Sequence, residues 1–190
     1  MAIKAVIFDC FGVLIVSGTT KLFSDYPDKA NEITDLISRS DYGMLSRQQF
    51  DQAIAEMIGL PTNEVTEKYW RKSYRSEQTI DWVKSLKQQG SYKVALLSNI
   101  GPKWIDDFIP KSELNEMFDE IVLSGEVMMT KPNPEIFEYT ANKLSLRPDE
   151  CLFIDDTMKN VESAQLVGMK SVLFGTFDQA KSDVEQILGE

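Results

Sequence analysis

The sequence predicts an α/β protein with a doubly wound parallel sheet and a small α-helical cap. Five short apolar runs read as strands: residues 3–8, 93–97, 120–123, 151–154 and 171–174. Helical patterns separate most of them, and strands that alternate with helices form parallel sheets covered on both faces. The stretch from 16 to 85 has helical patterns and no convincing strand, which indicates an insert. A chain of 190 residues suits one core with such an insert.

Local signals place the framework of the core along the chain. The first run ends at Asp9, shortly before a glycine. Asn133 and Pro134 fit the N-cap and the first position of a helix. A shorter helical pattern follows the run at 151–154, and Gly168 can end it. These helices are expected to connect the strands and cover the sheet.

Residues 16–85 are predicted to form the helical cap, and residues 1–15 and 86–190 the α/β core. Ser46 and Gln49 fit a capping box at the start of one cap helix. The apolar residues of that helix recur on one face: Phe50, Ala53, Ile54, Met57 and Ile58. Because the insert follows the first strand, it lies above the carboxyl end of the sheet, where a helical module acts as a lid.

Composition excludes several classes of function. The formal net charge of -10 disfavours a nucleic-acid partner, and no apolar run approaches the length of a membrane span. The first residues lack the pattern of a secretory signal, so we expect a cytoplasmic protein; the sequence does not indicate its oligomeric state. The chain has no histidine, which excludes Ser-His-Asp and Cys-His catalysis and histidine-ligated metal sites.

Polar residues stand at or just beyond the carboxyl ends of the predicted strands. They are Asp9, the pair Ser98-Asn99, Lys131 and the pair Asp155-Asp156. In open α/β sheets, ligands bind in the crevice outside these strand ends. The four groups together supply a nucleophile, a cradle for an anion, a fixed cation and a site for a hard metal ion.

The order and spacing of these motifs resemble those of the haloacid dehalogenase (HAD) superfamily of hydrolases. The resemblance is carried by IFDCFGVL from residue 7, SN at 98, TKPNP from 130 and IDDTMKNVESA from 154. It covers essentially the whole chain and is closest to subfamily I, whose small phosphatases have a helical cap after the first strand. Each motif alone is common, but four in this order are specific. The resemblance implies a HAD-like Rossmannoid core.

The resemblance implies a nucleophile and a magnesium cofactor. Asp9 would attack an electrophilic phosphorus and form an aspartyl-phosphate, which water then hydrolyses. Mg²⁺ would be held by Asp9, the backbone carbonyl of Phe11 and Asp155, with Asp156 beside it. Which of the two neighbouring aspartates is the direct ligand stays open. Mg²⁺ prefers octahedral oxygen ligation, which such a set supplies together with phosphate and water.

The remaining motifs would bind the phosphate of a small phosphorylated metabolite. Ser98 and the N–H of Asn99 would hold the phosphoryl oxygens. Lys131 would offset the negative charge that Asp9 and the phosphate bring together. Asn160 would orient Lys131 or an acidic ligand.

Position 11 departs from the family pattern. The phosphatases of the family usually have a second aspartate two residues after the nucleophile, which protonates the leaving alcohol and later activates water. This chain has Phe11. Its carbonyl can still bind metal, but its side chain cannot transfer a proton, and such transfer typically contributes about 10²- to 10⁴-fold in rate. Hydrolysis of phosphate esters should therefore be slowed unless another group substitutes.

Three hypotheses about function follow. The first is a Mg²⁺-dependent phosphatase with an altered acid–base arrangement. The second is a haloacid dehalogenase, in which Asp9 displaces halide from carbon and no leaving group needs a proton. The dehalogenase branch of the family has tyrosine at the position of Phe11. The third is a protein that keeps the fold but binds a phosphorylated ligand or a partner without catalysis. Tyr42 and Met44 are candidate specificity residues of the cap by position alone, and Tyr42 fits a cap-core aromatic equally well.

Overall fold

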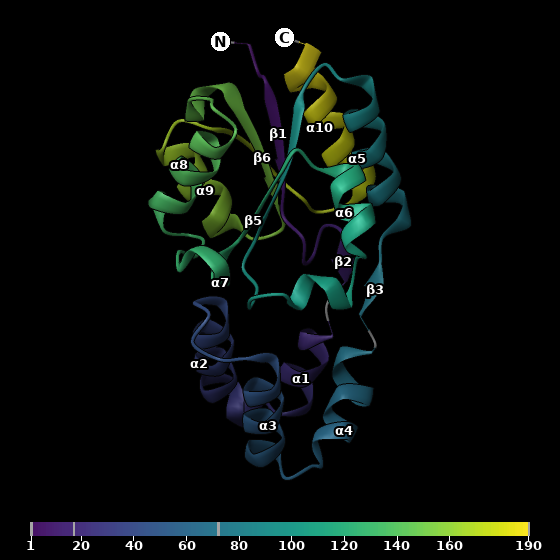
Figure 1. The fold of residues 1–190 in the computed structure, drawn as a ribbon, viewed down its shortest axis with the longest axis vertical. Helices are drawn as coiled ribbons and strands as arrows, with labels where there is room; N and C mark the ends of the chain where they lie inside the picture. Colours follow the sequence, from purple (N-terminus) through teal and green to yellow (C-terminus); the bar gives the residue numbers. More distant parts are fainter. Residues whose placement is uncertain (1, 17, 72, 190) are drawn as a thin grey trace.

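A parallel sheet of five strands forms the centre of the protein, in a computed structural model that describes residues 2–16, 18–71 and 73–189 (Figure 1). The strand order is β5-β4-β1-β6-β7. The strands are β1 (Ala5–Phe8), β4 (Lys93–Ser98), β5 (Glu120–Leu123), β6 (Cys151–Asp155) and β7 (Lys170–Leu173). The predicted fold class and all five predicted strands are confirmed, with small differences at the strand ends. Phe8 of β1 is in register with Leu96 and Ile154, so the carboxyl ends of the three central strands meet at one edge.

Helices cover both faces of the sheet. One face carries α5 (Glu77–Gln89), α6 (Lys111–Met117) and α10 (Phe177–Gly189), and the other carries α8 (Pro134–Lys143) and α9 (Met158–Leu166) (Figure 1). Side chains alternate along β1 as the pleat requires: Val6 and Phe8 pack on the first layer, and Ala5 and Ile7 on the second. Shorter helical segments lie between the strands: η3 (Trp104–Asp107), α7 (Ser124–Val127) and η4 (Pro148–Glu150). Because both faces are buried, the strands are continuous apolar runs.

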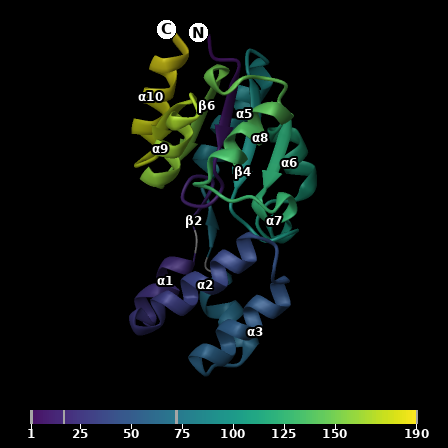
Figure 2. The ribbon, with the colours of Figure 1, turned by 90° about the vertical axis from the view of Figure 1, so that its left-hand side faces the viewer.

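The cap lies at the carboxyl end of the sheet, opposite the two chain termini (Figures 1 and 2). It comprises α1 (Thr19–Asp25), η1 (Pro27–Lys29), α2 (Ala30–Asp41), α3 (Arg47–Ile58), α4 (Thr62–Val65) and η2 (Thr66–Trp70). These helices enclose a separate apolar cluster around Ile33, Ile54 and Tyr69. The cap therefore has its own small core.

A short antiparallel ribbon joins the cap to the sheet domain. It pairs β2 (Ile15–Val16) with β3 (Tyr74–Arg75). The expectation that residues 16–85 contain no strand was wrong, because two-residue strands are too short to show an alternating pattern. The expected boundary at residue 85 falls inside α5, whose Trp82 packs edge-to-face on Phe8 at 5.2 Å. We propose that the ribbon marks both boundaries of the cap and that α5 belongs to the sheet domain.

Several contacts join the cap to the sheet domain. The Ser124 hydroxyl donates a hydrogen bond of 2.6 Å to the carbonyl of Asp41, the last residue of α2. Arg47 of α3 forms an ion pair of 3.2 Å with Asp107. At Gly43, which has φ 74°, a Cβ would lie 2.4 Å from the carbonyl oxygen of Gly125. A side chain at Gly43 would therefore push the two parts away from each other.

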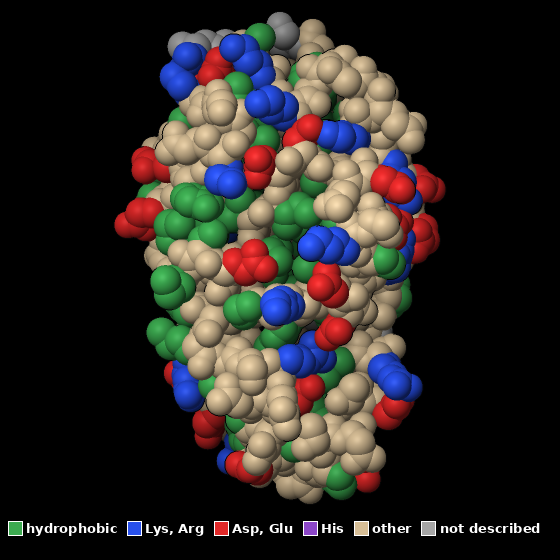
Figure 3. Space-filling view, in the orientation of Figure 1, with side chains coloured by type: hydrophobic (Ala, Val, Ile, Leu, Met, Phe, Trp, Pro, Cys, Tyr) green, Lys and Arg blue, Asp and Glu red, His purple; other side chains and the backbone are tan. Residues whose placement is uncertain are grey.

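The face of the protein in Figure 3 is mixed in charge. In Figure 3, Lys and Arg side chains lie among Asp and Glu side chains, including the strip over the junction between the cap and the sheet domain. No described helix combines the length and apolar character that a membrane crossing requires.

The capping box at the start of α3 gives a testable contribution to stability. The Ser46 hydroxyl accepts a hydrogen bond from the backbone N–H of Gln49. In return, the side-chain oxygen of Gln49 accepts one from the backbone N–H of Ser46. We expect Ser46→Ala to lower the free energy of unfolding by about 1 kcal/mol, measured by urea denaturation. Ser38→Ala, at an exposed position within α2, is the matched control and should leave stability nearly unchanged. A loss of equal size in both variants would show that the hydrogen bonds of the capping box do not contribute to stability.

Candidate active site

Asp9 stands at the carboxyl end of the central strand. Its amide donates to the carbonyl of Ile154 at 2.9 Å, and the chain then turns sharply at Gly12, whose φ of 83° favours glycine. The Asp9 Oδ1 accepts a hydrogen bond of 2.7 Å from the Cys10 amide. No described residue donates a hydrogen bond to Asp9 Oδ2. Burial raises the pKa of the Cys10 thiol well above its usual range, which disfavours the reactive thiolate at this strand end and leaves Asp9 as the candidate nucleophile.

Lys131 lies between two buried carboxylates. Its Nζ is 2.7 Å from Asp9 Oδ1 and 2.6 Å from Asp155 Oδ2. Burial by itself would lower the pKa of Lys131, but the two carboxylates outweigh it and raise that pKa, so the lysine stays charged. Burial raises the pKa of Asp9 to about 8; Lys131 opposes the rise and the Asp155 charge adds to it. The single positive charge of Lys131 does not neutralise the nearby carboxyl groups, so binding of a further cation at this site is electrostatically favourable.

Asn160 fixes the orientation of Asp155. Its amide nitrogen donates to both carboxylate oxygens of Asp155 at 3.0 Å, and the Thr157 amide donates to Oδ1 at 2.8 Å. Together with Lys131, these donors occupy both oxygens of Asp155. Asn160 was expected to orient either Lys131 or an acidic residue, and in the structure it donates to the acidic residue Asp155.

Three carboxylates converge above the end of β1. One oxygen each from Asp9, Asp155 and Asp156 lies within 4.8 Å of the others. Asp156 points toward the turn after β1, where a Cβ at Gly12 would lie only 2.0 Å from Asp156 Oδ2. Glycine at this position therefore makes room for the carboxylate. Oxygen ligands and an excess of negative charge are the donor set that Mg²⁺ prefers, so the residues present fit this ion.

The residues after β4 complete the site. The Asn99 side chain accepts a hydrogen bond from the Lys131 amide and donates one to the Lys131 carbonyl, both at 2.9 Å. This pair ties the end of β4 to the segment that carries the lysine, directly before a cis Lys131–Pro132 peptide bond. The hydroxyl of Ser98 is fully buried, and its polar neighbour is the thiol of Cys10; no described oxygen or nitrogen atom pairs with it. A thiol is a weak hydrogen-bond partner, so a bound anion oxygen would offer this hydroxyl a stronger one.

Two adjoining cavities open at this edge of the sheet. The first, of about 410 Å³, is lined by Asp9, Lys131, Asp156 and Asn160. The second, of about 220 Å³, lies between the cap and the sheet domain. Phe11, Thr19 and Asn99 line both cavities. A molecule with one end at Asp9 can therefore extend past Phe11 toward the cap.

Phe11 stands where a proton donor is usual in the resembling phosphatases. Its ring packs edge-to-face on Phe108 at a centroid distance of 5.2 Å. The sequence interpretation did not assign to the site three residues that line the second cavity: Ser40 and Asp41 of α2, and Trp104 of η3 in the sheet domain. No spacing in the sequence marks them, because α2 and η3 reach the site only through the packing of the cap on the sheet domain.

The two cap residues expected to contact substrate lie elsewhere. Neither Tyr42 nor Met44 lines either cavity. The hydroxyl of Tyr42 accepts a hydrogen bond of 2.9 Å from Asn133 in the sheet domain. The Met44 side chain is 67% exposed. Tyr42 thus bridges the cap and the sheet domain, and Met44 faces outward.

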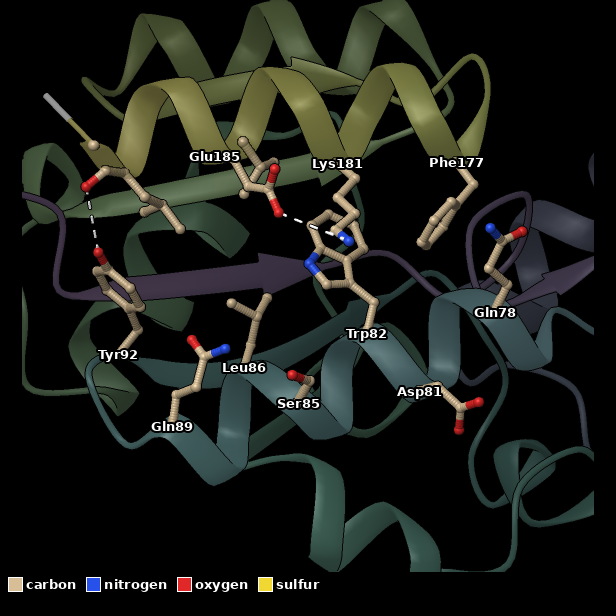
Figure 4. Close-up of a pocket in the computed structure, with 13 residues that line it drawn as sticks. Gln78, Asp81, Trp82, Ser85, Leu86, Gln89, Tyr92, Phe177, Lys181 and Glu185 are labelled. Carbon is tan, nitrogen blue, oxygen red and sulfur yellow. Dashed lines mark hydrogen bonds and ion pairs between the residues drawn. The ribbon is translucent and has the colours of Figure 1, made fainter.

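A separate groove lies between α5 and α10, on one face of the sheet. Trp82 and Tyr92 lie along it, and Lys181 forms an ion pair of 3.8 Å with Glu185 on its rim (Figure 4). None of the candidate site residues lines this groove. The chemistry-bearing side chains gather at the carboxyl end of the strands instead.

Comparisons with known proteins agree with this geometry. The family model of haloacid dehalogenase-like hydrolases matches residues 3–168. The drimenol cyclase drtB of Aspergillus calidoustus is 30% identical over 152 residues, which cover 77% of this chain but only 29% of that protein. The D-ribitol-5-phosphate phosphatase of Bacteroides thetaiotaomicron is 28% identical over 188 residues, covering 89% of this chain and 90% of the relative.

Solved structures share the fold. A HAD family enzyme of Bacteroides thetaiotaomicron, crystallised with magnesium and inorganic phosphate, superposes with a TM-score of 0.76. It is 24% identical, and the match covers 94% of this chain and 98% of that one. The catalytic motifs, the sheet order and the match to the family model agree, and the chain therefore belongs to the haloacid dehalogenase-like hydrolases.

Proposed function

We propose that this hydrolase is a Mg²⁺-dependent phosphatase of a small phosphorylated compound. The observation that carries the proposal is the contact of Lys131 with Asp9 and Asp155, with Asp156 near enough to share a cation. A ribitol phosphate phosphatase is among the relatives, and a structural neighbour was crystallised with magnesium and phosphate. Both findings support phosphoryl chemistry at a site of this kind.

The reaction would begin with attack of Asp9 on the phosphorus. Asp9 Oδ2, which has no donor among the described residues, is the oxygen placed to attack. An aspartyl-phosphate forms as the P–O bond to the leaving group breaks, and the leaving oxygen takes its proton from water because Phe11 supplies none. Lys131, already on Oδ1, offsets the charge of the approaching phosphoryl group. The Ser98 hydroxyl donates to one phosphoryl oxygen. Water then attacks the phosphorus of the aspartyl-phosphate, which releases inorganic phosphate and restores the Asp9 carboxylate.

Mg²⁺ would be held by Asp9, the Phe11 carbonyl and an oxygen of the Asp155-Asp156 pair. We propose Asp156 as the direct ligand of the pair, because Lys131, Asn160 and the Thr157 amide already occupy both oxygens of Asp155. The bound ion would neutralise phosphoryl charge next to the nucleophile.

A panel of substrates tests the proposal. We expect phosphate release from p-nitrophenyl phosphate and from small alkyl phosphates only when Mg²⁺ is present, measured as inorganic phosphate with and without EDTA. Phe11 also favours a second candidate, a 2-haloacid dehalogenase, because displacement of halide needs no proton donor. Halide release from 2-chloropropionate without Mg²⁺, and no release of phosphate, would establish that second activity and overturn the first.

The pKa of Asp9 predicts how magnesium binding depends on pH. Because burial raises this pKa to about 8 in the metal-free protein, the ion must displace a proton at neutral pH. We expect the apparent Kd for Mg²⁺ to rise by about tenfold for each pH unit below 8. Titration calorimetry at pH 6, 7 and 8 and constant ionic strength measures this. An equal Kd at all three values would contradict the raised pKa.

A further inference from the structure

The second cavity lies where the leaving group of a substrate would project. It adjoins the cavity of the nucleophile across Phe11, Thr19 and Asn99, and it holds about 220 Å³. A water molecule occupies about 30 Å³ of liquid, so this space suits a chain of a few carbon atoms with their hydroxyls. It is closed on the other side by the cap helices α2 and α3.

Aromatic rings form the walls of this cavity. They are the side chains of Phe11, Phe50, Trp70, Trp104 and Phe108. The guanidinium of Arg47 lies 4.8 Å from the ring centre of Trp104 and 5.6 Å from that of Trp70. Its charge is already matched by Asp51 at 3.0 Å and Asp107 at 3.2 Å. The walls therefore offer flat faces, on which C–H groups pack well, without an unmatched positive charge.

Unpaired polar groups stand among these rings. The Ser40 hydroxyl and the Trp104 indole N–H are buried and have no hydrogen-bond partner among the described residues. Both polar atoms lie 2.9 Å from the position that a Cβ would take at Gly101, so they lie near each other. No described residue donates a hydrogen bond to the carboxyl of Asp41. The Trp70 indole N–H is also buried without a hydrogen bond to a described residue, so four groups in the lining could form hydrogen bonds with a ligand.

We propose that this cavity holds the leaving group and that Ser40, Trp104 and Asp41 recognise a short, uncharged, polyhydroxylated chain, such as that of a pentitol phosphate. The inference rests on the proposed phosphatase function and names its substrate class. Ser40 and Trp104 donate to hydroxyl oxygens, and Asp41 pairs with a hydroxyl hydrogen. Aromatic faces with a few hydrogen-bonding groups suit the alternating C–H and O–H groups of such a chain.

The charge of the cavity supports an uncharged leaving group. Burial raises the pKa of Asp41 to about 7, and the charge of Lys131 opposes the rise. A carboxylate on the leaving group would meet the partly ionised Asp41, while Arg47 is held by two carboxylates of its own. Repulsion from Asp41 therefore acts against acidic leaving groups.

Three matched substrates of the wild-type protein test the class: ribitol 5-phosphate, pentyl phosphate and 5-phosphoribonate. The first has the hydroxyls, the second lacks them, and the third carries a carboxylate in place of the terminal CH₂OH. We expect kcat/KM for ribitol 5-phosphate to exceed both others by at least about tenfold. Equal or better use of pentyl phosphate or of the carboxylate would overturn this inference but leave a Mg²⁺-dependent phosphatase. No Mg²⁺-dependent release from any ester, p-nitrophenyl phosphate included, would overturn both.

Two variants test the residues. Ser40→Ala and Trp104→Phe each remove one donor, and phenylalanine keeps an aromatic face at position 104 although it is smaller than the indole. Each should lower the ratio of kcat/KM for ribitol 5-phosphate to that for pentyl phosphate by about tenfold, since loss of packing alone affects both esters. Ser40→Ala should leave the urea midpoint nearly unchanged, because its hydroxyl has no partner in the free protein, whereas Trp104→Phe also weakens contacts with Phe50 and Arg47. Ser38→Ala, exposed on the same helix as Ser40, is the control. A wild-type ratio in both test variants would overturn the assignment.

Discussion

Asp9→Asn is expected to reduce Mg²⁺-dependent phosphate release by about 10⁴-fold or more, as the loss of a covalent nucleophile does in other enzymes. The amide keeps the shape of the carboxyl group but cannot attack phosphorus and is a weaker ligand for a cation. The measurement is single-turnover release of inorganic phosphate with saturating Mg²⁺. Asp178→Asn, an exposed change in the first turn of α10, is the matched control and should retain full activity.

The free energy of unfolding of the Asp9→Asn variant should be at least that of the wild type. The folded-state pKa of Asp9 is raised to about 8, above its unfolded value of 3.8, so the folded protein binds this proton more tightly. The wild type then loses stability as the pH rises from about 4 through 8, and the variant lacks this loss. Urea denaturation without metal, at pH 6 and pH 9, measures the difference. An unfolded variant, or full activity in a folded one, would contradict the role of Asp9.

Phe11→Asp is expected to raise the hydrolysis of alkyl phosphates by about 10²-fold, the lower end of what a positioned proton donor contributes. Phe11 lines both the cavity of Asp9 and the cavity under the cap, so a carboxyl group there lies beside the path of the leaving oxygen. Its backbone carbonyl is unchanged by the substitution. p-Nitrophenyl phosphate, whose leaving group needs no proton, should gain little. The measurement is kcat for both esters at saturating Mg²⁺.

Phe11→Leu is the control for this gain. Both substitutions remove the edge-to-face contact with Phe108, but only aspartate adds an acid. We expect no gain with leucine. If alkyl phosphate hydrolysis fell in both variants, the ring itself would be needed, as a wall between the two cavities, and the missing acid would not limit the rate.

The strands and the position of Asp9 at a strand end were predictable because their signals are local. A buried parallel strand needs apolar residues on both faces, and the five runs show this directly in the sequence. The strand ends also bring Asp9, Asn99 and Asp155 to one edge, since parallel strands in register end together. The two-residue ribbon at Ile15–Val16 was not predictable, because its pairing depends on where the cap returns to the sheet domain.

The roles of individual polar groups were only partly predictable. Lys131 and Asn160 both donate hydrogen bonds to the carboxylate of Asp155. These contacts depend on side-chain geometry, which cannot be read from the spacing of residues in the sequence. Tyr42 was a candidate for substrate contact by position, yet its hydroxyl meets Asn133. Helix α2 turns Ser40 and Asp41 toward the cavity at its last turn.

By itself, the sequence determined a parallel α/β sheet, a helical insert and a set of acidic and basic groups at the strand ends, because periodicity and strand-end chemistry are properties of short segments. Only the tertiary structure decided which groups touch Lys131 and which cap residues line a cavity together with Phe11. These outcomes depend on how the cap packs on the sheet domain, through contacts between residues far apart in the chain.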